Sequence, residues 1–126
     1  MYERTITGLL LVVALIHLLP ISGLLGGERL ASLYAIEITD GNLEILMRHR
    51  AILFGLLGAF LAYAAFIPRL QPLAFLAAGI SVTSFLFLSI SVGEFNDAIR
   101  KVVIADIVAS ICLLSAVTLF ILKRYG

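Results

Sequence analysis

The sequence predicts an all-α integral membrane protein, a four-helix bundle with a short interfacial helix between the first two spans. Of its 126 residues, 62% are hydrophobic and 13% are charged, whereas about 25% of the residues of a soluble domain are charged. The apolar residues gather in four stretches, and each is long enough as a helix to cross about 30 Å of hydrocarbon. Since four spans leave little chain for anything else, we expect one transmembrane domain over residues 1–126.

The first predicted span covers residues 5–25. Pro20 lies near its end and is expected to kink or end the helix, because proline has no N–H to donate. The stretch 28–36 carries apolar residues at helical spacing beside charged ones, which is typical of a helix that lies at the membrane surface. In the turn that follows, either Asp40 or Asn42 can cap the next helix.

The other three predicted spans cover residues 43–67, 73–92 and 97–122. Only a short connection that begins at Pro68 separates the second span from the third, so these two should form a tight antiparallel hairpin. Asn96 stands just before the fourth span and is a candidate N-cap. With four spans, both termini lie on the same side of the membrane.

The basic residues bear on the orientation of the chain. The bare count of lysine and arginine is nearly level between the two sides, which is the quantity that the positive-inside rule uses. On the side opposite the termini, however, the basic residues have acidic neighbours. The side of the termini holds only Glu3 against four basic residues, Arg4, Arg69, Lys123 and Arg124. We therefore expect both termini to lie in the cytoplasm.

Ionisable residues enter the spans near the membrane face opposite the termini. Charge inside a bilayer is costly, so a shared site is the default hypothesis. The residues that converge there are His17, Glu44, Arg48, His49, Arg50, Glu94 and Asp106, and all but Arg50 belong to the predicted ligand-binding or charged cluster.

Arg48 is the predicted anchor of this cluster. Steps of three and four residues from Glu44 through Arg48 lead only to small residues, which mark the face where membrane helices approach closely. This predicted packing face consists of Ala51, Gly55, Gly58 and Ala62. We therefore expect Glu44 and Arg48 to point into the bundle or toward a tightly packed partner. At least one of His49 and Arg50, which are turned away from that face, should reach the headgroups.

The third span shows a second ordered face. Ser81, Ser84, Ser91 and Glu94 follow each other at helical spacing. Serines in membrane helices often bond back to their own backbone. Alternatively, they form a polar groove that leads to the carboxylate, and the spacing leaves both possibilities open.

Three functions are compatible with these patterns. The leading hypothesis is binding of an amphipathic small molecule, lipid-like or quinone-like, or of a partner subunit, with Arg48 as the anchor and the acids of the cluster as its counter-charges. The first alternative is a membrane enzyme in which a histidine and an acid of the cluster exchange protons. The second alternative is a structural scaffold that forms a homo-oligomer through the Gly55 and Gly58 face.

Other classes of function lack their sequence signals. The formal net charge is +1, and there is no basic patch for a nucleic acid. The chain has no Walker loop, dinucleotide fingerprint, CxxC pair or nucleophile elbow. Neither histidine stands in a pair such as HxxxH that would suit zinc. We therefore expect no cofactor and no metal, and we favour binding over catalysis.

The run LMRHRAILFGLLG, residues 46–58, resembles the second-helix signature of small DoxX-like four-span bacterial membrane proteins. A proline near the end of the first span and a tyrosine in the short helix after it, here Pro20 and Tyr34, extend the resemblance over the first two spans. The last two spans agree in architecture only. The resemblance implies the four-span fold and a location in the bacterial cytoplasmic membrane. Some members of that wider group are subunits of quinone-linked oxidoreductases, a role that would here require a partner subunit or a quinone.

Overall fold

The computed structural model describes residues 2–125, which form helices and connecting loops without any strand. Four long helices make up the bundle: α1 (Tyr2–Leu18), α3 (Gly41–Ala64), α4 (Gln71–Val92) and α5 (Asp97–Tyr125). Three shorter elements connect them: the 3-10 helix η1 (Leu19–Leu25), the helix α2 (Gly27–Tyr34) and the 3-10 helix η2 (Pro68–Leu70). The predicted all-α bundle with a short helix between the first two spans is therefore confirmed.

The four long helices have the length and composition of membrane spans. Each is apolar enough to cross a bilayer, and the first span continues from α1 to Ile21. Large apolar side chains such as Leu15, Leu76 and Ile90 are exposed on the outside of the bundle. An apolar exterior of this extent suits lipid and would be unfavourable in water. The chain thus has the architecture of a multi-pass membrane protein.

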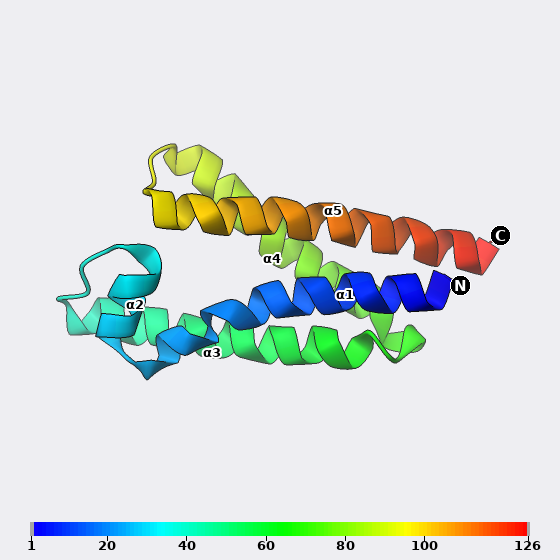
Figure 1. The fold of residues 1–126 in the computed structure, drawn as a ribbon, viewed down its shortest axis with the longest axis horizontal. Coiled ribbons are helices and arrows are strands. Elements are labelled where there is room, and N and C mark those ends of the chain that lie inside the picture. Colours follow the sequence, from blue (N-terminus) through cyan, green and yellow to red (C-terminus); the bar gives the residue numbers. More distant parts are fainter. Residues whose placement is uncertain (1, 126) are drawn as a thin grey trace.

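Helix α1 is the centre of the bundle, because it packs against both α3 and α5. Helix α4 packs mainly against α5. Figure 1 shows α1, α3 and α5 running alongside one another, with α4 inclined to them. Both termini lie at one end of the bundle, and α2 lies at the other end (Figure 1).

The buried core lies in the half of the bundle nearer the termini. Helix α1 contributes Ile6, Leu10 and Val13, which are fully buried. Helices α4 and α5 meet through small side chains, the fully buried Ala74, Ala78, Ala109 and Ala116. Small residues let membrane helices approach closely, and close packing replaces the hydrophobic driving force that lipid cannot supply.

The predicted packing face of the second span lies against the first span within the same chain. A Cβ atom added to Gly58 would be 2.7 Å from Leu18 Cγ and 3.1 Å from the backbone oxygen of Ala14. A Cβ atom at Gly55 would be 2.6 Å from Ile21 Cδ1. Ala51 is also buried, and Ala62 is half-buried. The Ile21 side chain can move aside but the Ala14 backbone cannot, so the need for glycine is strongest at Gly58, where α3 crosses the end of α1.

The ends of the helices follow local sequence signals. Helix α1 ends at Leu18, and Pro20 stands at the start of η1, as the missing proline N–H predicts. Asp40 is the N-cap of α3, and its Oδ1 accepts a hydrogen bond of 3.0 Å from the Asn42 N–H. Asn96 caps α5 through a hydrogen bond of 2.8 Å from the Ile99 N–H to its Oδ1.

The short helix α2 is amphipathic, as expected of an interfacial helix. Leu30 and Tyr34 are buried, while Glu28 and Arg29 are exposed. The helix ends at Tyr34, two residues earlier than the sequence predicts, because Ala35 adopts a left-handed conformation with φ of 53°. The buried side of α2 faces η1 and α3, which places this helix over the end of the bundle opposite the termini.

Candidate functional site

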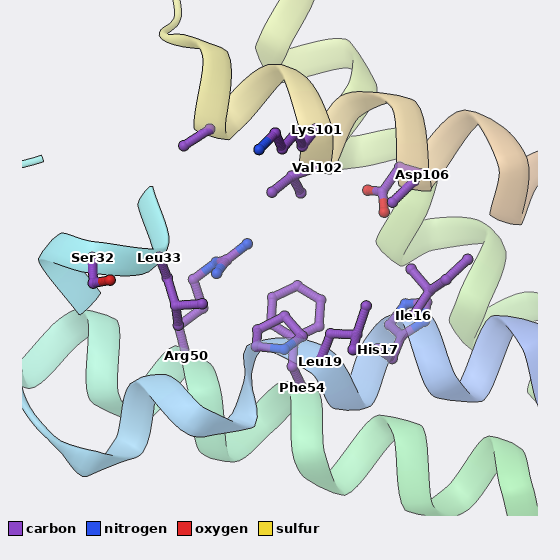
Figure 2. Close-up of a pocket in the computed structure, with 13 residues that line it drawn as sticks. Ile16, His17, Leu19, Ser32, Leu33, Arg50, Phe54, Lys101, Val102 and Asp106 are labelled. Atoms are coloured by element: carbon purple, nitrogen blue, oxygen red, sulfur yellow. The ribbon is translucent and has the colours of Figure 1, made fainter. Parts of the chain in front are cut away.

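A cavity of about 300 Å³ lies between α1, η1, α2, α3 and α5, at the end of the bundle opposite the termini. Figure 2 shows the side chains that line it. Its apolar wall includes Ile16, Leu19, Leu33, Phe54 and Val102. Its polar lining consists of His17, Ser32, Arg50, Lys101 and Asp106. A mostly apolar lining with a few polar groups is typical of small-molecule sites.

Arg50 is held in place by two aromatic rings. Its Cζ atom lies 4.4 Å from the centroid of the Phe54 ring, one helical turn further along α3, and 5.6 Å from that of Tyr34. Its Nη1 donates a hydrogen bond of 2.9 Å to the Tyr34 hydroxyl. Cation–π contacts reach about 2 kcal/mol where water is excluded. The guanidinium group is thus fixed, and it extends from α3 across the cavity toward α5 (Figure 2).

Tyr34 is itself positioned by contacts that fix both ends of α2. At the start of the helix, the Gly27 N–H donates a hydrogen bond of 2.8 Å to Glu44 Oε1, so a carboxylate meets the positive end of the helix. At the other end, Asn96 Nδ2 donates to the backbone oxygens of Tyr34 at 2.7 Å and Ala35 at 3.1 Å. The loop before α5 therefore helps to hold Tyr34 against Arg50.

Helix α5 supplies the opposite wall of the cavity. Lys101, Val102, Ala105 and Asp106 line it, and steps of one, three and four residues put them on one face of the helix. Asp106 is half-buried and Lys101 is exposed. Figure 2 shows the Asp106 carboxylate extending from α5 toward α1 and α3. The cavity thus has one cation on α3, and a second cation with one anion on α5.

His17 lies at the base of the cavity and is only 3% exposed. Its Nδ1 is 2.9 Å from the Val13 backbone oxygen, and its Nε2 is 2.9 Å from Ser81 Oγ. Because a carbonyl oxygen only accepts, Nδ1 carries the proton and the Nε2 of the neutral ring accepts from the serine hydroxyl. Both ring nitrogens are therefore occupied, and the histidine joins α1 to α4.

The sequence left open whether the serines of α4 bond to their own backbone or form a polar groove, and the structure shows contacts of both kinds. Ser81 reaches across to His17. Ser84 donates a hydrogen bond of 3.0 Å back to the Ser81 backbone oxygen, within its own helix. Ser91 and Glu94 are exposed near the end of α4 and do not line the cavity. A continuous polar groove does not form.

The structure brings two residues of the predicted cluster, His17 and Asp106, to the same cavity. Glu44 is half-buried and holds α2, while His49 and Glu94 are exposed. Arg48 is also exposed, so the expectation that it points into the bundle of this chain is wrong. The neighbouring Arg50 takes the inward position instead, while His49 is the one of the pair that reaches the surface.

Sequence reasoning placed Arg50 at the right membrane face but left it out of the predicted cluster, and it missed Lys101 and Tyr34 as components of the site. The signal for Arg50 was its spacing of four residues from Phe54, which allows a cation–π contact along one helix. The signal for Lys101 was its position one helical turn before Ala105 and close to the face of Asp106. Tyr34 carried no such signal, because only the folding of α2 onto α3 brings it to Arg50.

Within residues 2–125, no three histidine, cysteine, aspartate or glutamate side chains gather as a metal site would require. Comparison with protein-family models finds none that matches the chain, and neither the curated proteins nor the solved structures include a match. The likeness to DoxX-like proteins therefore stays a prediction.

Proposed function

We propose that this protein binds an amphipathic molecule in the cavity between α1, η1, α2, α3 and α5. The observation that carries the proposal is the position of Arg50, a cation fixed by two aromatic rings inside a cavity with mostly apolar walls. Arginine presents a planar fork of donors that suits a phosphate or a carboxylate. Arg50 would thus take the place that the sequence suggested for Arg48.

The walls of the cavity support an amphipathic ligand over a small polar one. Ile16, Leu19 and Leu33 lie on the side of α1, η1 and α2, and Val102 faces them from α5. An acyl or isoprenoid chain could lie along these residues. Burial of apolar area stabilises binding by about 25 cal/mol per Å², but only for area that is transferred out of water. For a ligand that already resides in the bilayer, the polar head must supply the selectivity.

The alternatives lose part of their support. An enzyme that uses His17 for proton transfer needs a ring nitrogen that is available to the substrate, and both nitrogens are engaged with Val13 and Ser81. A scaffold that assembles through Gly55 and Gly58 needs that face on the outside, and it packs against Leu18 and Ile21 inside the chain. We therefore place ligand binding first.

The bilayer in question is, in this proposal, the bacterial cytoplasmic membrane, with both termini in the cytoplasm. The excess of basic over acidic residues at the end of the termini supports this orientation. A cysteine introduced at Thr39, in the loop between α2 and α3, should react with a membrane-impermeant thiol reagent in intact cells. Labelling only after cell lysis would show that the termini lie outside the cytoplasm and that the proposed orientation is wrong.

DoxX-like membership is likewise a proposal, supported by the run at residues 46–58 and by the four-span fold. An experimental structure of a DoxX-like protein tests it. A helix order that differs from that of this chain, without the short second helix, would contradict the proposed membership.

Native mass spectrometry of protein released gently from membranes tests the binding function. The wild type should retain an adduct of lipid-like mass, and Arg50→Gln should lose it. Arg48→Gln is the matched control, since it removes the same charge two residues away from an exposed position of the same helix. Thermal unfolding of both variants in detergent shows that the comparison is made between folded proteins.

Two results would count against the proposal. One is a wild-type protein that carries no adduct. The other is an adduct that Arg48→Gln loses and Arg50→Gln keeps, which would move the anchor to the outer surface of α3.

A further inference from the structure

The charges that line the cavity are not paired with one another. Arg50 makes one hydrogen bond, to Tyr34. Within residues 2–125, neither Arg50 nor Lys101 forms an ion pair with Asp106, although all three line the same cavity. Charges at membrane depth are expensive unless something compensates them. The cavity therefore offers two cations and one anion to whatever occupies it.

We propose that the polar head of the bound molecule is zwitterionic, with a phosphate at Arg50 and Lys101 and a primary ammonium group at Asp106. This inference depends on the proposed function, because it names the class of amphipathic ligand that the same cavity binds. A phosphate matches the donors of the two cations, and an ammonium N–H matches the acceptor oxygens of the carboxylate. The shared chemistry is that of phosphoethanolamine, either as a lipid headgroup or as a free small molecule.

The cavity disfavours a quaternary ammonium head such as phosphocholine. Quaternary nitrogen has no N–H to donate to Asp106, and proteins usually hold such groups against the faces of aromatic rings. The aromatic ring that lines this cavity is Phe54, and the Arg50 guanidinium already lies over it at 4.4 Å. Tyr34 is buried and also faces Arg50. Arg50 thus already takes the cation position over Phe54, and the two rings do not form the open aromatic cage that usually holds a quaternary cation.

A purely anionic head such as phosphoglycerol fits less well for a different reason. It would satisfy Arg50 and Lys101 but would bring a second negative charge near Asp106 without giving that carboxylate a cation. Asp106 extends into the cavity from α5 (Figure 2), so a bound headgroup lies close to its carboxylate. The expected order of affinity is therefore phosphoethanolamine lipid first, with phosphocholine and phosphoglycerol lipids well behind.

A lipid panel with matched acyl chains tests this order. Delipidated protein in detergent is mixed with phosphoethanolamine, phosphocholine or phosphoglycerol lipid, and the bound fraction is measured by native mass spectrometry. We expect the phosphoethanolamine lipid to bind about tenfold more tightly than the other two, which is the effect of roughly one charge-assisted hydrogen bond. Asp106→Asn should abolish that preference while leaving the binding of phosphoglycerol lipid intact, which also shows that the variant is folded.

Matched variants separate the inference from the proposed function. Asp97→Asn removes an exposed carboxylate from the same helix and should keep the preference. Arg50→Gln should weaken all three lipids. If the wild type binds the three lipids equally and Arg50→Gln still weakens all of them, the zwitterion inference is wrong and the proposed function stands. If Arg50→Gln changes none of them, the proposed function fails as well.

Soluble phosphoethanolamine distinguishes the two sources of the headgroup. Added in millimolar excess, it should leave the bound lipid in place if the apolar walls hold the tail. Displacement of the lipid by the soluble head, with loss of the effect in Asp106→Asn, would identify a free zwitterion as the ligand.

Discussion

The two halves of the bundle use their residues in different ways. In the half nearer the termini, which we call the packed half, the helices meet through fully buried apolar side chains, from Ile6 and Leu10 on α1 to Leu61 on α3 and Ala116 on α5. In the half around the cavity, which we call the open half, charged side chains from α3 and α5 line a space between the helices.

The difference shows how a small membrane protein can keep unpaired charges without losing its fold. Helices in lipid associate through close packing, since the bilayer gives them no hydrophobic reason to do so. The packed half supplies that association. The contacts of the open half therefore do not have to hold the four helices together. They can position side chains instead, and Arg50 and Asp106 stay apart.

The largest effect should come from filling the space at Gly58, where α3 lies against the backbone of α1. A Cβ atom at Gly58 would lie 2.7 Å from Leu18 Cγ and 3.1 Å from the Ala14 backbone oxygen, and backbone cannot move aside as a flexible side chain can. Gly58→Val should therefore cost the upper end of about 1–3 kcal/mol, as overpacking does. Thermal unfolding in detergent measures it.

Gly8→Val is the control, because Gly8 lies on α1 and a Cβ atom added there meets nothing within 4 Å. If both variants unfold at the same temperature, the close approach of α1 to α3 does not contribute to the stability of the bundle.

A smaller and more local effect is expected from the open half. Asn96→Ala removes both the cap of α5 and the hydrogen bonds to the end of α2. Loss of an N-cap costs about 0.5–2 kcal/mol. Because α2 loses its tie to α5, hydrogen exchange should speed up in α2 far more than in the core of α1.

Asn42→Ala serves as the control, since the side chain of Asn42 is exposed and only its backbone N–H takes part in the cap of α3. Equal exchange rates in α2 for the two variants would mean that Asn96 does not hold the short helix.

Much of the fold could be predicted from the sequence, because it depends on local signals. The spans follow from apolar length, the break at Pro20 from a missing N–H, and the cap at Asn96 from a side-chain oxygen. These features need only the residues next to them. The direction of the packing face of α3 could also be read from its small residues, since Ala51, Gly55 and Gly58 are all buried.

The site was harder to predict because it depends on where long side chains end and where α2 folds. Arg48 continues the small-residue face of α3, but the direction of its Cα–Cβ bond does not fix the end of a flexible side chain, and it is exposed. Arg50 points inward because α2 lies over α3 and offers Tyr34 to it. That contact joins residues 16 positions apart, and no periodicity within either helix encodes it.

The smallest effect should come from the charges of the packed half. Lys123 Nζ lies 2.9 Å from Glu3 Oε1, and this is the ion pair that joins the two ends of the described chain. Both side chains are exposed enough for water and salt to screen them, and such pairs add little to stability. Glu3→Gln should therefore leave the unfolding temperature unchanged, at low salt as well as high. A clear fall in that temperature, relieved by added salt, would show that the packed half depends on its terminal charges and not on its apolar contacts alone.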